Sequence, residues 1–442
     1  MEQFAHYLSE GAPSGPALSR RVREAVHAIL TMAEFSRRQF LTHTLKGSSL
    51  VALSSLVPQF VSRTAQAAAP GKDNILVVLE MSGGNDGLNT VIPYADDLYH
   101  KARPTLRQTS NEVIRLDAHV GLHSGLQGLK PLWQQGQLAV VQGVGYPNPE
   151  RSHFEAMDIW QSADPKGRVT TGWLGRAAAE GKDFSGGVPI LHLGPNGLPR
   201  AVAGASGGGA VTLNSEHTFR LELGGGKAGQ KNARRRLLED LAAPAGKGDD
   251  LASFVQRRQV QTLTAVEQLR DLLEGPNAVP RQGTGLSQKL QLIAGLIAKG
   301  FGTRIFYLNL DGFDTHYAQS LTHQNLLAEF ADSVGGFFQT LKKTGHDRRV
   351  RLLTFSEFGR RVHENGSRGT DHGAASCLFL AGPSVQGGVV GKHPSLADLD
   401  AGDLKFHTDF RAVYATLLDH WLSCDSKAVL GAKWDHVQQL GV

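Results

Sequence analysis

The sequence predicts an α/β fold in which a mainly parallel central sheet is flanked by helices. Short apolar runs of strand length recur along the chain, amphipathic helical stretches lie between them, and polar or glycine-rich turns end the runs. With 442 residues, 40% apolar and 20% charged, the chain can bury a large core. Its two cysteines, Cys377 and Cys424, are far apart in the sequence. We expect both to be buried apolar side chains rather than parts of a disulfide framework or a zinc site.

Five continuous apolar runs are the predicted strands. A run that is apolar on both faces is typical of a strand buried in a parallel sheet. A glycine-rich turn with polar groups follows the first run, and a loop leading to a helix start at Ser152 follows the second. The runs cover residues 74–80, 138–144, 304–310, 349–355 and, as a shorter fifth, 378–381.

Two long segments between these runs have the apolar spacing of amphipathic helices, residues 251–273 and 321–343. The segment from about 204 to 280 has a different composition, with two glycine triplets and a basic run at 227–236. We expect an insertion there, which either caps the edge of the sheet or forms a surface excursion. The basic run is predicted to be the solvated start of a helix, and no nucleic-acid motif accompanies it.

The chain ahead of the first strand has the features of a twin-arginine export signal. Ser36-Arg37-Arg38-Gln39-Phe40-Leu41 matches the consensus, and the uncharged stretch at 47–62 is too short and too serine-rich to span a bilayer. Arg63 follows, and Ala65-Gln66-Ala67 is a small-x-small cleavage site, so the mature chain would begin near Ala68. The opposing interpretation is a chance arginine pair before a buried helix.

This signal, at 32–67, predicts a periplasmic or secreted protein that the twin-arginine translocase exports in the folded state, without a permanent membrane anchor. Residues 1–31 do not fit the pattern, and Met32 lies where such signals begin. We therefore interpret residues 1–31 as an extension upstream of the true start, and residues 68–442 as a single α/β domain with its insertion. Export in the folded state favours a bound metal, because the compartment of folding decides which ion is loaded.

Polar side chains gather after the predicted strands, where open α/β sheets place their ligands. Hard oxygen and imidazole ligands that converge from several strands are what metal-assisted hydrolysis needs. Taken singly, an Asp or His at a strand end is more often a turn former or a cap. The set as a whole predicts a site for one or two ions, and its members are Asp86, Asp314, His316, Glu357, Asp371 and His372.

Three further residues are candidates for the chemistry itself. Ser152 stands at a predicted helix start, where it is either an N-cap or a nucleophile, because helix N-terminal amides favour a nearby anion. Arg151 precedes it, and Arg360 follows the fourth strand. Either guanidinium could pair with an anionic substrate.

The chain resembles the bacterial exported family called domain of unknown function 1501, which lies within or close to the alkaline phosphatase and sulfatase superfamily. The resemblance covers about residues 74–420 and is specific in the order and spacing of its motifs. These are Ser82-Gly83-Gly84-Asn85-Asp86-Gly87-Leu88-Asn89, Arg151-Ser152-His153-Phe154, Thr171-Gly172-Trp173-Leu174-Gly175-Arg176, Phe313-Asp314-Thr315-His316, Ser356-Glu357-Phe358-Gly359-Arg360 and Gly369-Thr370-Asp371-His372-Gly373.

The superfamily resemblance implies an alkaline phosphatase-like core and a role for individual residues. Asp86 stands in place of the first-strand aspartate that binds metal, and Ser152 in place of the nucleophile. Asp314 and His316 resemble the ligands of one metal, although the superfamily usually spaces them more widely.

The later motifs depart from the superfamily pattern. His372 is placed to supply the late histidine, with Asp371 beside it. Where the superfamily has an Asp-His pair, this chain has Glu357 and Phe358. Glu can replace Asp, but Phe358 cannot ligate a metal, so the resemblance leaves one-ion and two-ion sites both open.

These observations predict an exported metal-dependent hydrolase of a small phosphate or sulfate ester, with one or two ions of zinc, manganese or calcium. An alternative from another class is a non-catalytic exported binding or assembly protein, which the missing histidine at Phe358 favours. A third is a structural envelope protein whose strand-end polar residues are caps. Metal content separates the first two from the third, and an ester assay separates the first from the second.

Overall fold

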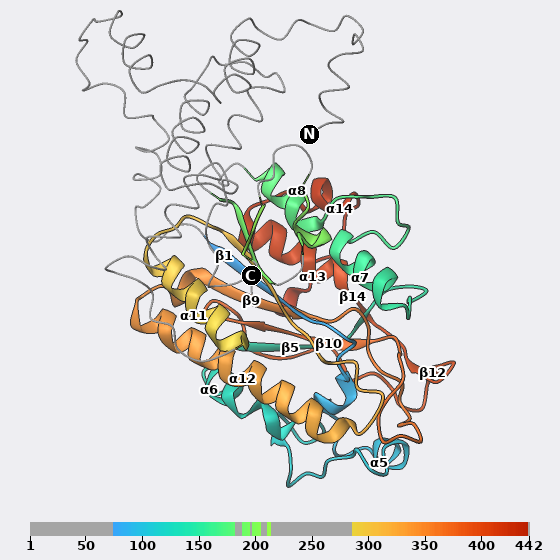
Figure 1. The fold of residues 1–442 in the computed structure, drawn as a ribbon. Helices are drawn as coiled ribbons and strands as arrows, with labels where there is room; N and C mark the ends of the chain where they lie inside the picture. Colours follow the sequence, from blue (N-terminus) through green and yellow to red (C-terminus); the bar gives the residue numbers. More distant parts are fainter. Residues whose placement is uncertain (1–73, 182–187, 195–196, 205–209, 214–284, 441–442) are drawn as a thin grey trace, which may run out of the picture. The chain divides into compact units, whose positions relative to one another are not determined.

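The computed structural model describes residues 74–181, 188–194, 197–204, 210–213 and 285–440, all within one compact unit of the chain. The export segment at 32–67, residues 1–31 and the predicted helix at 251–273 lie outside the described residues. In the described part, a nine-stranded sheet has the order β11-β5-β10-β9-β1-β8-β6-β7, with β14 paired to β5 (Figure 1). Its strands are β1 (Ile75–Met81), β5 (Leu138–Gly145), β6 (Ile190–Leu193), β7 (Ala210–Leu213), β8 (Ile305–Leu310), β9 (Val350–Phe355), β10 (Ser376–Ala381), β11 (Gly388–Val390) and β14 (Thr408–Asp409).

The sheet is mainly parallel, as predicted. β1 pairs in parallel with β8 and β9, and β5 pairs in parallel with β11 and β14. Only β10, among the described strands of this sheet, runs antiparallel to both of its neighbours, β5 and β9. All five predicted strands are confirmed within two residues at each end.

The sequence did not predict the outer strands of the sheet. β6 and β7 extend it beyond β8, and β11 and β14 flank β5. β7 falls inside the segment that we expected to be an insertion, so the sheet continues to Leu213 before the chain leaves the described region. These edge strands have two to four residues each, too few for a clear apolar run.

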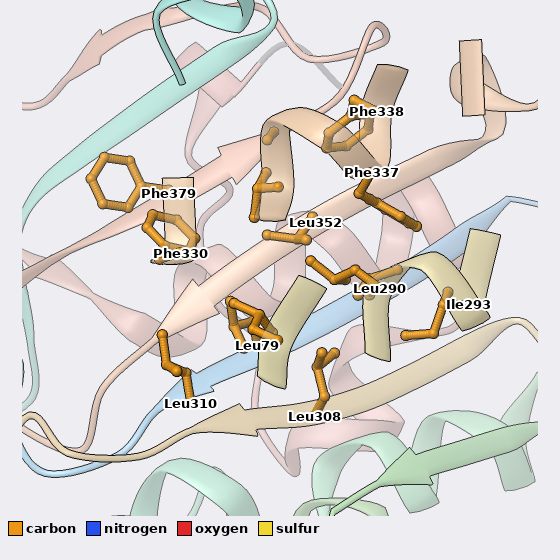
Figure 2. Packing of buried hydrophobic residues seen from close by; sticks show 14 of the residues in the cluster. Leu79, Leu290, Ile293, Leu308, Leu310, Phe330, Phe337, Phe338, Leu352 and Phe379 are labelled. Carbon is orange, nitrogen blue, oxygen red and sulfur yellow. The ribbon is translucent and has the colours of Figure 1, made fainter. Parts of the chain in front are cut away.

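Helices cover both faces of the sheet, because the side chains of each strand alternate between two cores. In β1, Val77 and Leu79 pack in one core with α11 (Gly285–Ala298) and α12 (Gln319–Lys343). Figure 2 shows this core, in which Leu79 and Leu352 of the sheet form one cluster with Leu290 of α11 and with Phe330 and Phe337 of α12. The helix predicted at 321–343 is thus confirmed.

The opposite face of the sheet packs against a second group of helices. Leu76 and Val78 of β1 share a core with Trp173 of α8 (Trp173–Glu180) and Tyr414 of α13 (Phe410–Leu417). The other α-helices of the described residues are α5 (Asp97–Ala102), α6 (Lys130–Gln134), α7 (His153–Ser162) and α14 (Ser426–Leu430). Two small sheets lie apart from the large one, the first formed by β2 (Val91–Ile92), β3 (Ile114–Arg115) and β4 (Gly121–Leu122) and the second by β12 (Leu399–Asp400) and β13 (Asp403–Leu404).

Two further features of the described chain bear on the sequence analysis. Cys377 and Cys424 are both buried, as predicted. No helix in the described ranges has the combination of length and apolar character that crossing a bilayer requires.

The predicted site residues lie along one edge of the sheet, the one formed by strand ends and not by an outer strand. The C-terminal ends of β1, β5, β8 and β9 lie at this edge, because these strands run in the same direction. Asp371 and His372 reach the edge differently: they precede β10, and β10 begins there because it is antiparallel. The loop after the fourth strand therefore returns to the same edge.

Candidate metal centre

Four side chains from three loops converge on one point at this edge. The Asp314 carboxylate lies at the centre, with its Oδ1 3.2 Å from Nε2 of both His316 and His372. Its Oδ2 is 3.5 Å from Nε2 of His153. Nε2 of His316 and Nε2 of His372 are 2.9 Å apart. One ligand atom each from His153, Asp314 and His372 lies within 4.8 Å of the others, which is close enough to share a metal ion.

Close backbone packing makes this convergence feasible. Gly83, which follows β1, has φ +115°, and a Cβ there would lie 2.4 Å from the backbone nitrogen of Asp314. Only glycine therefore lets the β1 loop run against the β8 loop at this point. The fully buried Arg360 guanidinium donates to the carbonyls of Gly84 at 2.6 Å and Thr370 at 2.7 Å, and to Asp314 Oδ1 at 2.8 Å. It thereby ties three loops together.

The far nitrogen of each imidazole is held by an oxygen that can only accept. Nδ1 of His153 lies 2.8 Å from Glu357 Oε1, and Nδ1 of His316 lies 3.1 Å from Asp371 Oδ1. Nδ1 of His372 lies 2.9 Å from the carbonyl of Arg151. In the neutral ring, a hydrogen bond of this kind places the proton on Nδ1 and leaves a lone pair on Nε2.

Three imidazole lone pairs and a carboxylate therefore point at one another. Two facing lone pairs 2.9 Å apart repel unless a cation lies between them, either a proton or a metal ion. Burial lowers the pKa of His372, which disfavours a proton there, while the hydrogen bond to Glu357 raises the pKa of His153. Burial opposes the ionisation of Asp314, but the hydrogen bond from the Arg360 guanidinium and its positive charge outweigh burial and lower the pKa to about 2. The carboxylate is thus negative at neutral pH.

Imidazole nitrogens and one carboxylate form a donor set that suits a transition-metal ion, zinc in particular. The outer hydrogen bonds of the rings match the arrangement that commonly orients metal-binding histidines, in which Nδ1 is held by a carboxylate or a carbonyl. The four residues thus fit a divalent ion both in their chemistry and in how they are oriented.

Asp86, which the sequence predicted as a metal ligand, lies in a buried ion pair in the structure. Its buried carboxylate accepts from both terminal nitrogens of Arg103, at 2.6 and 3.2 Å, and also from Gln319. Burial by itself raises the pKa of a carboxyl, but the Arg103 guanidinium outweighs it and lowers the pKa of Asp86 to about 2. Both oxygens are occupied inside the protein, so Asp86 forms a buried ion pair rather than a ligand of this centre.

Glu357 and Asp371 are near the centre but do not face it. Glu357 is buried, and besides His153 it accepts from the amide of Gly83 at 2.9 Å. Asp371 accepts from His316 and from Asn365 Nδ2, the latter at 3.0 Å. The sequence predicted both as ligands, whereas in the structure they accept hydrogen bonds from the outer ring nitrogens of His153 and His316.

The candidates for the chemistry also differ in their surroundings. Ser152 is at the N-cap position of α7, yet its side chain makes no capping hydrogen bond. Arg151 pairs with Asp403 through Nη2, and its buried Nε has no hydrogen-bond partner among the described residues. The Arg360 guanidinium donates hydrogen bonds to backbone carbonyls and to Asp314. These bonds occupy its nitrogens, so it is not free to hold a substrate anion as the sequence suggested.

Sequence reasoning did not select His153 as a ligand. It is the first residue of α7 and directly follows Ser152, so the signal was present in the Arg-Ser-His-Phe run after β5. Phe358 has no side-chain atom that could bind a metal ion. Its ring packs against those of His153 and His372, with centroid distances of 4.9 and 4.5 Å, and forms an apolar wall of the centre.

The fold and this centre define a class: α/β proteins with a candidate histidine and aspartate metal site at the strand ends. The chain belongs to the family described as "Protein of unknown function (DUF1501)", whose model matches residues 73–433. This confirms the family resemblance seen in the sequence. A search of the curated proteins found no significant match.

Solved structures similar to this chain include sulfatases and phosphatase-superfamily proteins. The PsFucS1 sulfatase from Pseudoalteromonas sp. is 12% identical, with a TM-score of 0.33 over 85% of this chain and 72% of that one. A protein in the alkaline phosphatase superfamily from Vibrio parahaemolyticus is 10% identical, with a TM-score of 0.33 over 84% and 69%. The phosphonate monoester hydrolase SpPMH from Silicibacter pomeroyi is 12% identical, with a TM-score of 0.32 over 84% and 77%. These similarities are weak, so the activity has to be argued from the residues of this chain.

Proposed function

We propose that this protein is a metal-dependent hydrolase of phosphate or sulfate esters that acts after export by the twin-arginine route. The observation that supports it most is the convergence of three oriented imidazoles on the Asp314 carboxylate, one of them on His153, which directly follows Ser152 in the chain. His153, His316, His372 and Asp314 would hold the ion. When bound, the ion would supply charge neutralisation at the ester oxygens and Lewis-acid polarisation.

One ion fits the described residues better than two. Asp86, which a second ion would need, is enclosed by Arg103 and Gln319. Glu357 and Asp371 are engaged with the outer nitrogens of the rings. The nitrogen-rich donor set favours zinc over calcium, because calcium prefers six to eight oxygen ligands.

The first turn of α7 and the side chains of Arg151 and Ser152 offer donors to an oxyanion, whereas the amides of Arg151 and Ser152 already donate to Glu150 Oε1. α7 begins at His153, and the first amides of a helix have no partner within the helix, so they attract a negative group. The Ser152 hydroxyl is not used as a cap, and the unpartnered Nε of Arg151 is a further donor. The carbonyl of Arg151 binds His372, which fixes this segment against the centre.

In this proposal, Ser152 Oγ attacks phosphorus or sulfur and forms a serine ester. The alcohol leaves with the hydroxyl proton, and water then cleaves the serine ester and releases phosphate or sulfate. Glu357 and Asp371 keep the rings of His153 and His316 in place throughout. Phe358, packed against two of the rings, excludes water from that side.

The test compares zinc-loaded wild type with Ser152→Ala on p-nitrophenyl phosphate and p-nitrophenyl sulfate. We expect the variant to lose turnover by at least about a hundredfold while its metal content stays the same, because a nucleophile and not a ligand is removed. Ser395→Ala, which changes an exposed serine, is the matched control and should remain active. Metal-loaded wild type that turns over neither ester would refute the hydrolase and favour the non-catalytic binding protein.

A further inference from the structure

Large apolar side chains exposed to water concentrate beside the metal centre. Among the described residues, the three most exposed are Phe154 at 89%, Tyr317 at 78% and Leu321 at 67%. Two others, Leu98 and Leu198, are exposed to a smaller extent. Single exposed apolar residues are common and need no explanation, but a cluster around a site often has a binding role.

The two aromatic residues directly follow two histidines of the centre in the chain. Phe154 follows His153 in the first turn of α7, and Tyr317 follows His316 in the loop after β8. Since Nε2 of both histidines lies within 3.5 Å of the Asp314 carboxylate, the backbones that bear the two rings flank the centre from different elements. Leu321 lies in the first turn of α12, four residues beyond Tyr317.

The backbone that presents these side chains is held firmly. Asn365 Nδ2 donates to the carbonyl of His316 at 3.0 Å, and the amide of Ala318 donates to the carbonyl of Ser367 at 3.0 Å. A Cβ at Gly369 would lie 2.3 Å from the His316 carbonyl carbon, so the two loops are in close contact. Phe154 is fixed by the helix it belongs to. Rings on a rigid backbone lose little conformational entropy when they bind a ligand.

We propose that Phe154 and Tyr317, together with Leu321, form an apolar rim that binds the hydrophobic alcohol part of the ester substrate. This inference rests on the proposed function, because it assumes that the anionic part of the same molecule lies on the metal centre. The substrate class is then an amphiphilic phosphate or sulfate ester, whose apolar part is an aromatic ring or a long alkyl chain.

The experiment measures binding of compounds that cannot be hydrolysed at an ester bond. Zinc-loaded protein is titrated calorimetrically with methylphosphonate, phenylphosphonate and octylphosphonate. Wild type is expected to bind at least one of the two larger compounds roughly tenfold more tightly than methylphosphonate, since covering one aromatic side chain is worth at least that factor. The phenyl and octyl compounds separate aromatic from alkyl substrates.

Variants test whether the rim residues cause the tighter binding of the larger phosphonates. Phe154→Ala and Tyr317→Ala should reduce the preference for the larger compound and leave methylphosphonate binding unchanged, since neither side chain is a ligand. Leu98→Ala, which removes an exposed leucine of α5 with no centre residue beside it in the chain, should keep the preference. Equal binding of all three phosphonates by wild type, or an unchanged preference in both variants, would overturn the rim.

These experiments distinguish failure of the rim proposal from failure of the hydrolase proposal. A preference for the larger phosphonates without turnover of any ester would support the rim and refute the hydrolase. Turnover without any preference would refute the rim alone. If wild type sedimented with phosphatidylglycerol vesicles, lost this on Phe154→Ala and did not discriminate between phosphonates, the rim would be a membrane contact and our assignment would be wrong.

Discussion

Replacing Asp86 by Asn tests whether this carboxylate stabilises the fold or binds metal. The Asp86 and Arg103 side chains are both fully buried and are joined by two hydrogen bonds, at 2.6 and 3.2 Å. A neutral amide in place of the carboxylate would leave the guanidinium charge buried without a counter-ion. Removing one partner of such a pair costs about 3–5 kcal/mol of the free energy of unfolding. Asp398→Asn is the control, because its pair with Lys405 is exposed and should cost no more than about 1 kcal/mol.

The assay is urea unfolding of both variants at pH 7, with metal content measured on the same samples. We expect Asp86→Asn to lower the unfolding midpoint strongly while the folded protein keeps its metal. A normal midpoint together with lost metal would refute our assignment and restore Asp86 as a ligand.

The pH dependence of unfolding tests the same ion pair of Asp86 and Arg103. The pKa of Asp86 is about 2, against an ordinary value of 3.8, because the Arg103 guanidinium outweighs the effect of burial. A lowered carboxyl pKa stabilises the folded state above the unfolded pKa, here by about 2 kcal/mol. This contribution is fully present above pH 3.8 and is lost as the pH falls toward 2. Asp86→Asn should lack this part of the acid sensitivity.

Three further predictions concern the centre and export. Glu357→Gln should weaken zinc affinity about 10–100-fold in a competition titration, because His153 loses the carboxylate that orients it; equal affinity would contradict this role. Removing metal with a chelator should lower Tm, since an ion at 100 times its Kd stabilises the fold by about 2.7 kcal/mol, and an unchanged Tm would argue against a bound ion. Changing Arg37 and Arg38 together to Lys should stop export, and N-terminal sequencing of the exported wild type should begin near Ala68; export of the variant at the normal level would refute the signal.

The main strands could be predicted because their physical signal is local. A strand buried on both faces must be apolar throughout, so β1, β5, β8 and β9 were evident as continuous runs. β6 carries a histidine at position 192 and has only four residues, and β7 follows a glycine-rich stretch. Their place in the sheet depends on the pairing of β6 with β8 and of β7 with β6, which no short window of sequence reveals.

The sequence predicted most residues of the site, but it did not predict which of them face the centre and which hold the ligand side chains in place. Strand order brings Asp314 and His372 to one edge, and the residue types were enough to suggest this. Whether a carboxylate faces the centre depends on its partners: Arg103 lies 17 residues from Asp86, and Glu357 lies 204 residues from His153. Such pairs are tertiary contacts, so a single sequence cannot separate a ligand from a carboxylate that orients one.

The most direct test of this account is elemental analysis of the mature protein, exported by its own signal and purified without chelator. We predict about one transition-metal ion per chain, zinc in the first place, because three imidazoles and one carboxylate form a donor set that suits a single such ion. Asp314→Asn should lose the ion, whereas Asp311→Asn, an exposed carboxylate on the same loop, should keep it. Well-folded wild type without metal, or an Asp314→Asn variant that retains it, would contradict the metal centre.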